Sequence, residues 1–225
     1  MLRNPPERKA LTVTTNAKTT TKRMKYTKYI VILTLFALSS CVTNRLIFEN
    51  KEFNEFGELD IKTVIQLERQ KHSKDITPDH LIEIGEGIYP NKNKYILATP
   101  KTFEIKDKPN FKLETEYFYA VNDSLVKVIL YQWDYLQKSN RDLVEEENHA
   151  KKFKAFQTKF NNLTSKLTKE FGEPISKNIE QGNFKDETFR DDLKFKRADG
   201  MNAYLFMFGN DNNGYRQIRL AIYKD

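Results

Sequence analysis

The sequence contains little cysteine, little glycine and no long apolar run, and each shortage excludes a class of protein. Cys41 is the single cysteine among 225 residues, so no disulfide can form within the chain and a thiolate zinc site cannot be built. The 8 glycines form no phosphate-binding loop, dinucleotide fingerprint or Gly-x-Ser-x-Gly elbow. The apolar run from Tyr29 to Ser40 is 12 residues long, whereas a membrane-spanning helix needs about 20.

The N-terminal segment has the three-part pattern of a secretory signal. A basic head with Lys25 and Lys28 precedes the apolar run from Tyr29, and small residues follow it. Cations hold such a head on the cytoplasmic side while the apolar core enters the bilayer. We therefore expect residues 1–40 to be a leader, with Met24 as the start that gives it the usual compact length.

The end of this leader carries a specific motif, Leu38-Ser39-Ser40-Cys41. It resembles the lipobox of bacterial lipoproteins, and the resemblance covers about residues 24–41. It implies that the Cys41 thiol receives a diacylglyceryl lipid, that a peptidase cuts just before Cys41, and that the new N-terminus is fatty-acylated (palmitate or a similar chain). The alternative is an ordinary signal peptide followed by a structural cysteine.

The resemblance also implies a location in the cell envelope. Val42 follows the cysteine, so the aspartate that retains some lipoproteins in the inner membrane is absent. We therefore expect a lipid-anchored protein of the outer membrane, with its domain facing the periplasm, if the source cell has an outer membrane.

The net charge of +7 belongs entirely to the leader. Residues 1–41 contain eight lysines and arginines and one acid, whereas residues 42–225 contain 30 basic and 30 acidic side chains. A neutral mature domain has no overall charge to attract phosphate backbones. We therefore expect no nucleic-acid partner, and the lipid on Cys41 is the expected membrane attachment.

Strand-like alternation is strong in two regions. Residues 111–121 and 125–135 are rich in β-branched and aromatic side chains, and Asn122-Asp123-Ser124 lies between them, which predicts a β-hairpin. A C-terminal antiparallel ribbon is predicted for residues 193–196, 203–208 and 215–223. Residues 81–84 and 94–98 are weaker candidate strands, and Thr99-Pro100 and Lys108-Pro109 indicate irregular or edge structure between them and the hairpin.

The spacing of apolar residues predicts one long helix. Phe153, Phe156, Phe160, Leu163 and Leu167 form a stripe with spacings of three and four, which is typical of an amphipathic helix. Gly172 and Pro174 are expected to end it. A shorter helix is predicted for residues 58–70, although Thr63-Val64-Ile65 also suits a strand.

These elements predict an α+β fold. A helix with one apolar stripe must cover an apolar surface, so we expect an antiparallel sheet with one long amphipathic helix packed across one face, a two-layer sandwich. The expected organisation is a leader (1–40), a lipidated cysteine and tether (41–56) and a single soluble domain (57–225).

The residues able to carry chemistry form no recognised motif. His72, His80 and His149 make no HExxH pattern, so we predict no metal, with a site assembled from distant residues as the open alternative. The run from Gly209 to Gly214 resembles a calcium loop but lacks the required carboxylates, and a hairpin turn is favoured. Asp191-Asp192 and the three glutamates of residues 145–147 are candidates for the paired carboxylates of acid/base catalysis. Adjacent acids in a strand point to opposite faces, however, and acids at a helix start usually complement the helix dipole. We predict no cofactor.

One aromatic cluster has two interpretations. Tyr131, Trp133 and Tyr135 share strand parity, so they could form an exposed aromatic platform for sugar or peptide. The more frequent outcome for such residues is core packing against the helix stripe. Strand parity alone does not choose between the two interpretations.

The functional hypothesis is a non-enzymatic envelope lipoprotein whose domain binds an envelope protein or glycan. One alternative is a small envelope hydrolase, acting on cell-wall or glycan material with an active site assembled from distant residues. Another is a protective or inhibitory lipoprotein that binds a toxin or an enzyme.

Overall fold

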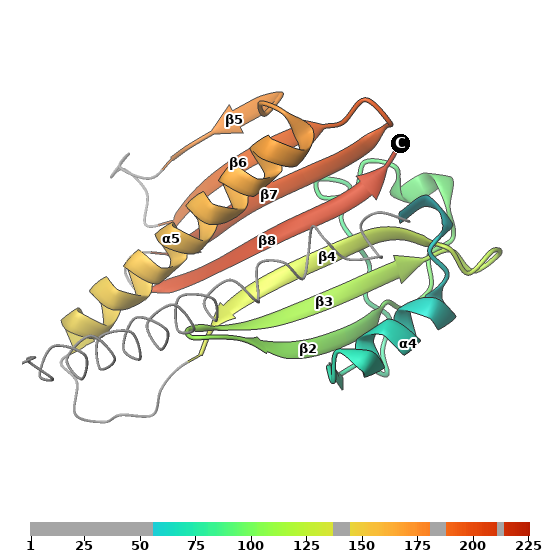
Figure 1. The fold of residues 1–225 in the computed structure, drawn as a ribbon, viewed down its shortest axis with the longest axis horizontal. Helices are drawn as coiled ribbons and strands as arrows, with labels where there is room; N and C mark the ends of the chain where they lie inside the picture. Colours follow the sequence, from blue (N-terminus) through green and yellow to red (C-terminus); the bar gives the residue numbers. More distant parts are fainter. Residues whose placement is uncertain (1–55, 137–144, 181–187, 211–213) are drawn as a thin grey trace, which may run out of the picture. The chain divides into compact units, whose positions relative to one another are not determined.

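The computed structural model describes residues 56–136, 145–180, 188–210 and 214–225. Within these ranges the chain forms eight strands, one long helix, one short helix and two 3₁₀ turns (Figure 1). The elements are η2 (Phe56–Glu58), α4 (Ile61–Gln70), β1 (Lys74–Asp75), η3 (Lys92–Lys94), β2 (Lys101–Asp107), β3 (Phe111–Tyr119), β4 (Val126–Tyr135), α5 (Glu145–Phe171), β5 (Ser176–Asn178), β6 (Thr188–Lys196), β7 (Met201–Asn210) and β8 (Tyr215–Lys224).

All eight strands belong to one antiparallel sheet with the order β1-β2-β3-β4-β8-β7-β6-β5. The order divides the domain into two successive halves, each a helix followed by a four-stranded meander. The last strands of the two meanders, β4 and β8, pair at the centre of the sheet, where Tyr131 lies opposite Leu220. The predicted α+β class, with an antiparallel sheet and one long helix, is confirmed.

The strongly patterned segments form the predicted elements. The hairpin is β3 and β4, the ribbon is β6, β7 and β8, and the predicted long helix is α5. Residues 61–70 are helical, as predicted, because Asp60 caps the helix by accepting hydrogen bonds from the backbone N–H groups of Lys62 and Thr63. Gly172, with φ of +86°, follows the last residue of α5 in the left-handed conformation that glycine adopts most easily.

The weaker strand predictions were wrong. Residues 81–84 form no strand, and residues 94–98 contribute only an isolated bridge between Leu97 and Ala120. The region flanked by Pro100 and Pro109, expected to be irregular or at an edge, contains the seven-residue strand β2. β2 lies between β1 and β3; its Phe103 is buried in the core, and the partly buried Ile105 packs against the same cluster.

The core lies on one face of the sheet and includes residues from both helices. Strand residues of one parity, such as Ile129, Leu205 and Leu220, are fully buried together with Val64 of α4 and Leu163 of α5. Burying a side chain of this size contributes roughly 1.5–3 kcal/mol. This face therefore supplies most of the apolar burial that stabilises the domain.

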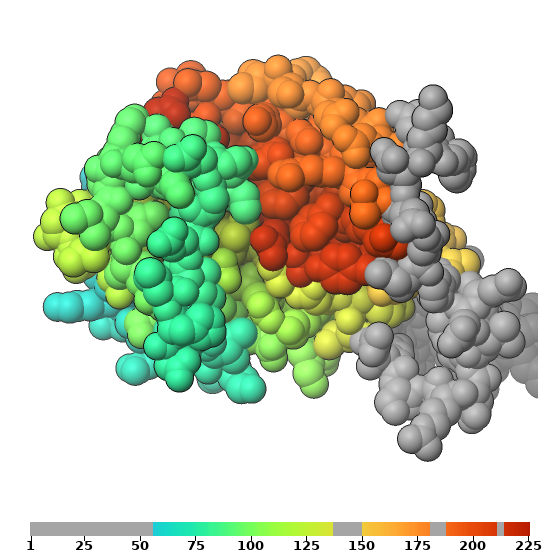
Figure 2. Space-filling view, turned by 180° about the vertical axis from the view of Figure 1, so that it is seen from behind, coloured from blue at the N-terminus to red at the C-terminus, as the bar shows by residue number. Residues whose placement is uncertain are grey.

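The opposite face, which we call the back face, is covered in part by the segment of residues 76–100. Ile84 and Tyr89 of this segment are buried against back-face strand residues such as Phe118 and Phe206. Tyr89 meets Tyr223 edge to face at 5.5 Å, and burial raises the pKa of Tyr89 to about 12. Figure 2 shows this green segment bordering the red and orange strands of the sheet.

The helices of the described chain and the predicted lipid anchor bear on membrane attachment in different ways. No helix within the described ranges is both long enough and apolar enough to cross a bilayer. The leader (1–40), including Leu38, Ser39 and Ser40, lies outside the described residues, as do Cys41 and the predicted tether up to residue 55. Phe56, where the described chain begins, is buried in the core.

Candidate functional site

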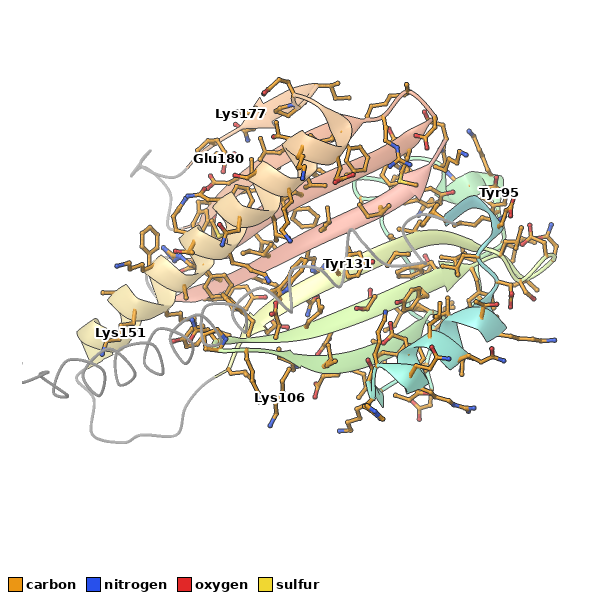
Figure 3. The ribbon with its side chains drawn as sticks, in the orientation of Figure 1. Tyr95, Lys106, Tyr131, Lys151, Lys177 and Glu180 are labelled. Atoms are coloured by element: carbon orange, nitrogen blue, oxygen red, sulfur yellow. The ribbon has the colours of Figure 1, made fainter. Side chains whose placement is uncertain are left out.

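The predicted aromatic cluster lies on the core side of β4. Trp133 is 0% exposed and Tyr131 is 4% exposed, and their rings stack at 6.1 Å. Tyr135 is partly buried and packs against Phe156 of α5. Figure 3 shows Tyr131 at the centre of the sheet. The exposed platform was therefore wrong for Trp133 and Tyr131, and core packing describes them.

A buried ion pair lies beside this cluster. Lys159 of α5 contacts Asp107 at the end of β2, with 2.5 Å between the lysine Nζ and carboxylate Oδ2 atoms. The indole Nε1 of Trp133 donates to the same oxygen at 2.8 Å, and the Lys159 ammonium lies 5.1 Å from the Trp133 ring centroid. The two charges satisfy each other away from water, so the network ties α5 to β2 and β4.

The other sequence candidates are not brought together. His72 and His80 are exposed, and the side chain of His149 lies outside the described residues. Asp191 is buried and accepts from the backbone N–H of Glu180, whereas Asp192 is on the other face of β6. Across the described part of the chain, no group of three or more His, Cys, Asp or Glu side chains could hold a metal ion.

A pocket lies on the back face, between the turn at residues 85–88 and strands β6, β7 and β8. Its volume is about 310 Å³. We call it the arginine–aromatic pocket, because two arginines and two phenylalanines of the sheet face the turn across it. Its lining residues are Gly85, Gly87, Ile88, Arg190, Phe206, Phe208 and Arg219.

Strand register explains why these side chains meet. Arg190 lies opposite Phe208 in the β6–β7 pair, and Phe206 lies opposite Arg219 in the β7–β8 pair. Because residues paired across antiparallel strands share a face, all four side chains point to the back. The rings of Phe206 and Phe208 are stacked at 6.0 Å and extend a row of aromatics that also includes Tyr204.

Arg190 is held against this row by stacking and by a hydrogen bond. Its guanidinium lies 4.7 Å from the centroid of Phe206 and donates to the Tyr204 hydroxyl at 2.7 Å. Asp192 is 3.9 Å from the Arg190 Nε atom, at the limit of an ion pair. The side chain of Arg190 is 46% exposed, so part of its guanidinium is open to solvent.

Arg219 is positioned by a polar chain along the back face. Its Nε donates to Gln217 at 2.8 Å, and Gln217 donates to Asp134 at 2.7 Å. The Arg219 guanidinium lies 5.6 Å from the Phe208 centroid. Arg219 is partly exposed, and within the described ranges no carboxylate lies at ion-pair distance from it.

Glu116 is a partly buried acid close enough to Arg219 to interact with its charge. Burial raises the pKa of Glu116, and the nearby Arg219 charge opposes that rise. A raised pKa favours the neutral form of this carboxyl as the pH falls.

The geometry suits recognition of an anion that carries a flat or apolar body. Guanidinium groups match the geometry of carboxylate and phosphate oxygens and stack on aromatic rings. Here the guanidinium groups of Arg190 and Arg219 lie against the rings of Phe206 and Phe208, and the turn at residues 85–88 lines the same pocket. Among the described residues that line this pocket, none is an acid or a histidine.

Sequence reasoning missed this pocket, although one signal for it was present. Aromatic residues occupy every second position of one predicted strand, at Tyr204, Phe206 and Phe208. In the last strand, Arg219 has the parity opposite to that of the apolar residues Ile218, Leu220 and Ile222. Both patterns indicate a second, aromatic and cationic face. Only the pairing of β6, β7 and β8 shows that the two sets share it.

The chain was compared with protein-family models, with curated proteins and with solved structures, and none matches. The function is therefore inferred from the residues and their geometry.

Proposed function

We propose that this chain is an exported lipoprotein, anchored by lipid on Cys41, whose domain binds an anionic component of the cell envelope in the arginine–aromatic pocket. The anchor is inferred from the leader and the lipobox-like Leu38-Ser39-Ser40-Cys41. The binding role is inferred from the pocket, whose described lining presents two guanidinium groups stacked on phenylalanine rings and includes no acid or histidine. In a cell with two membranes, the proposed location is the periplasmic face of the outer membrane.

The arrangement of the helices supports a two-layer sandwich, which we propose as the detailed fold. Apolar side chains of α5, including Phe156, Leu163 and Leu167, share one core cluster with strand residues of a single parity. In Figure 1, α5 lies against β6, β7 and β8, with which it makes its main strand contacts. With α4 and α5 on the core side, the back face is covered only in part, by residues 76–100.

The observation that carries the binding proposal is the pairing of Arg190 and Arg219 around a common space. Two positive side chains placed together on the surface of a neutral domain attract a negative group. The stacked rings of Phe206 and Phe208 add an apolar surface that suits the ring of a sugar or the side chains of a peptide. A carboxylated envelope glycan or peptide combines both features.

The enzyme alternative receives less support. A second pocket of about 200 Å³ lies between residues 81–84 and 92–97, and Glu83 is the single acid in its lining. Glycoside hydrolysis needs two carboxyl groups at a defined separation across a cleft. Among the described lining residues, neither pocket offers that pair.

A matched pair of sugars tests the proposed ligand chemistry. N-acetylmuramic acid carries a lactyl carboxylate that N-acetylglucosamine lacks, and inorganic phosphate supplies the anion alone. Titration of the mature lipoprotein in detergent, followed by calorimetry, should show tighter binding of the carboxylated sugar than of the neutral one. A charge-assisted hydrogen bond contributes roughly 1.5–3 kcal/mol, so Arg219→Gln should weaken binding at least about tenfold.

The control for this titration is Lys106→Gln, which removes an exposed cation near the far end of β2. It should leave the affinity unchanged. Equal affinity for the two sugars, or equal binding by wild type and the Arg190→Gln/Arg219→Gln double variant, would contradict the proposal. Binding of phosphate as tight as that of the carboxylated sugar would limit the site to recognition of the anion.

A further inference from the structure

Four of the eight exposed large hydrophobic side chains in the described ranges belong to residues 81–96 and the β3–β4 turn. Ile96 is 82% exposed, Leu81 is 63% exposed and Val121 is 60% exposed, and Tyr95 is 37% exposed. We call these four residues the tip surface. Isolated exposed apolar residues are ordinary, but a group of them marks a contact surface.

Direct contacts hold the tip surface together. The backbone N–H of Val121 donates to the carbonyl oxygen of Ile96 at 2.9 Å, which fixes residues 95–96 beside the turn. Leu81 and Tyr95 line the same small pocket. The ammonium group of Lys127 lies 4.7 Å from the centroid of the Tyr95 ring.

The described chain begins at the same end of the sheet. The carbonyl oxygen of Leu59 accepts from the N–H of Val126 at 2.8 Å, and the N–H of Ile61 donates to Ser124 at 3.0 Å. Residues 59–61 therefore run alongside the turn that carries Val121. Figure 1 shows this segment, the β3–β4 turn and the C-terminus at one end of the sheet, and Figure 3 shows Tyr95 there.

Residues 41–56 link this end of the sheet to the proposed lipid on Cys41. An extended chain of 15 residues reaches at most about 50 Å, so the segment keeps the domain close to the bilayer. The end of the domain where this segment joins therefore always stays within that distance of the lipid. The exposed apolar residues are found at that end.

We propose that the tip surface inserts into the lipid interface of the membrane that carries the protein, an inference that rests on the proposed anchor at Cys41. Tyrosine is enriched at membrane–water interfaces, where its ring is apolar and its hydroxyl reaches water. Lysines beside apolar residues bury their stems and keep the charge at the headgroup level. Lys92 lies beside the tip surface in the same small pocket, and Asp123 of the turn is paired with Lys127 at 2.8 Å.

Insertion gives the anchored domain a fixed orientation. A domain held by a tether alone would sample many orientations, whereas one held also by Leu81, Ile96 and Val121 presents one end to the lipid. Several weak attachments to one surface act together, because the first raises the effective concentration of the others. The tip surface would therefore position the arginine–aromatic pocket at a constant height above the membrane.

The chain offers a direct test, because Cys41 is its only cysteine and the lipid would block that thiol. Ile96→Cys and Val121→Cys each introduce one thiol for an environment-sensitive fluorophore. Lys106→Cys is the control, because Lys106 is exposed and pairs with Lys112 next to the β2–β3 turn, away from the tip surface. Each labelled lipoprotein is reconstituted into phosphatidylethanolamine–phosphatidylglycerol vesicles that contain a lipid-borne spin-label quencher.

The expected result is a blue shift and strong quenching of the fluorophore at positions 96 and 121, with neither effect at position 106. Equal quenching at positions 96 and 106 would overturn the inference. A blue shift at position 96 without lipid quenching, in a chain that elutes as a dimer, would assign the surface to a second copy and also overturn it. Uptake of the thiol label by wild-type protein would show that Cys41 is free, and the anchor itself would then be wrong.

Discussion

Replacement of Lys159 by methionine is expected to lower the free energy of unfolding by about 3 kcal/mol. The side chains of Lys159 and Asp107 are only 9% and 6% exposed, and removal of one partner of a buried ion pair costs roughly 3–5 kcal/mol. The lower end applies because Trp133 still donates to the Asp107 carboxylate. For a domain of this size the loss corresponds to a decrease in Tm of about 6–12 °C.

Urea unfolding followed by tryptophan fluorescence measures this loss directly. Trp133 is the only tryptophan in the chain and is fully buried beside the ion pair. The matched control is Lys154→Met on an exposed position of the same helix, which should change stability by less than about 0.5 kcal/mol. The double variant Lys159→Met/Asp107→Asn removes both charges and keeps an acceptor for Trp133, so it should recover much of the loss.

The reasoning fails if Lys159→Met is no more destabilising than Lys154→Met. It also fails if the double variant is less stable than the single one by a further 3 kcal/mol, because the two charges would then act independently.

Two further changes test the packing and the surface electrostatics. Gly209→Ala should destabilise the domain by about 1–3 kcal/mol in thermal unfolding, because an added Cβ would lie 2.3 Å from the carbonyl oxygen of Tyr215, whereas Gly87→Ala meets no atom within 4 Å and should be neutral; equal Tm values would contradict this. The Arg197 guanidinium lowers the pKa of Asp199 to about 2, so its stabilisation is complete above pH 4 and is lost as the pH falls through about 2. Arg197→Gln should return the pKa of Asp199 toward its ordinary 3.8 in an NMR titration, and an unchanged pKa would be inconsistent with the ion pair.

The elements that could be predicted from the sequence are those with a complete local pattern. Residues 111–135 alternate over two long strands with a turn between them, and residues 153–167 have helical spacing over four turns. Each pattern is long enough to specify its period without information from the rest of the fold. The helix cap at Gly172 was identified for the same reason.

The errors came from short segments in which local signals compete. Thr99-Pro100 and Lys108-Pro109 predicted irregular or edge structure, yet both prolines lie just outside the strand Lys101–Asp107, where they remove no ladder hydrogen bond. Residues 81–84 have an apolar pattern, but Ile84 is buried by packing a loop on the back face. The edge strands β1 and β5 contain only two and three residues and have no periodicity to detect.

The candidate site could not be located from the sequence because it depends on register. Arg190 and Arg219 are far apart in the chain, and they meet because Phe206 and Phe208 of β7 lie between their strands. Strand parity predicts which side chains share a face of one strand. It does not specify which strands pair, and the pairing places both arginines around one pocket.

The central claim is the lipid anchor, because both the location and the orientation of the binding domain depend on it. The most direct measurement is incorporation of labelled palmitate by wild-type protein and by the Cys41→Ala variant in bacterial cells. The account predicts a labelled wild-type protein, cleaved just before Cys41, and an unlabelled variant. Label in the Cys41→Ala protein, or a wild-type protein that carries none, would contradict it.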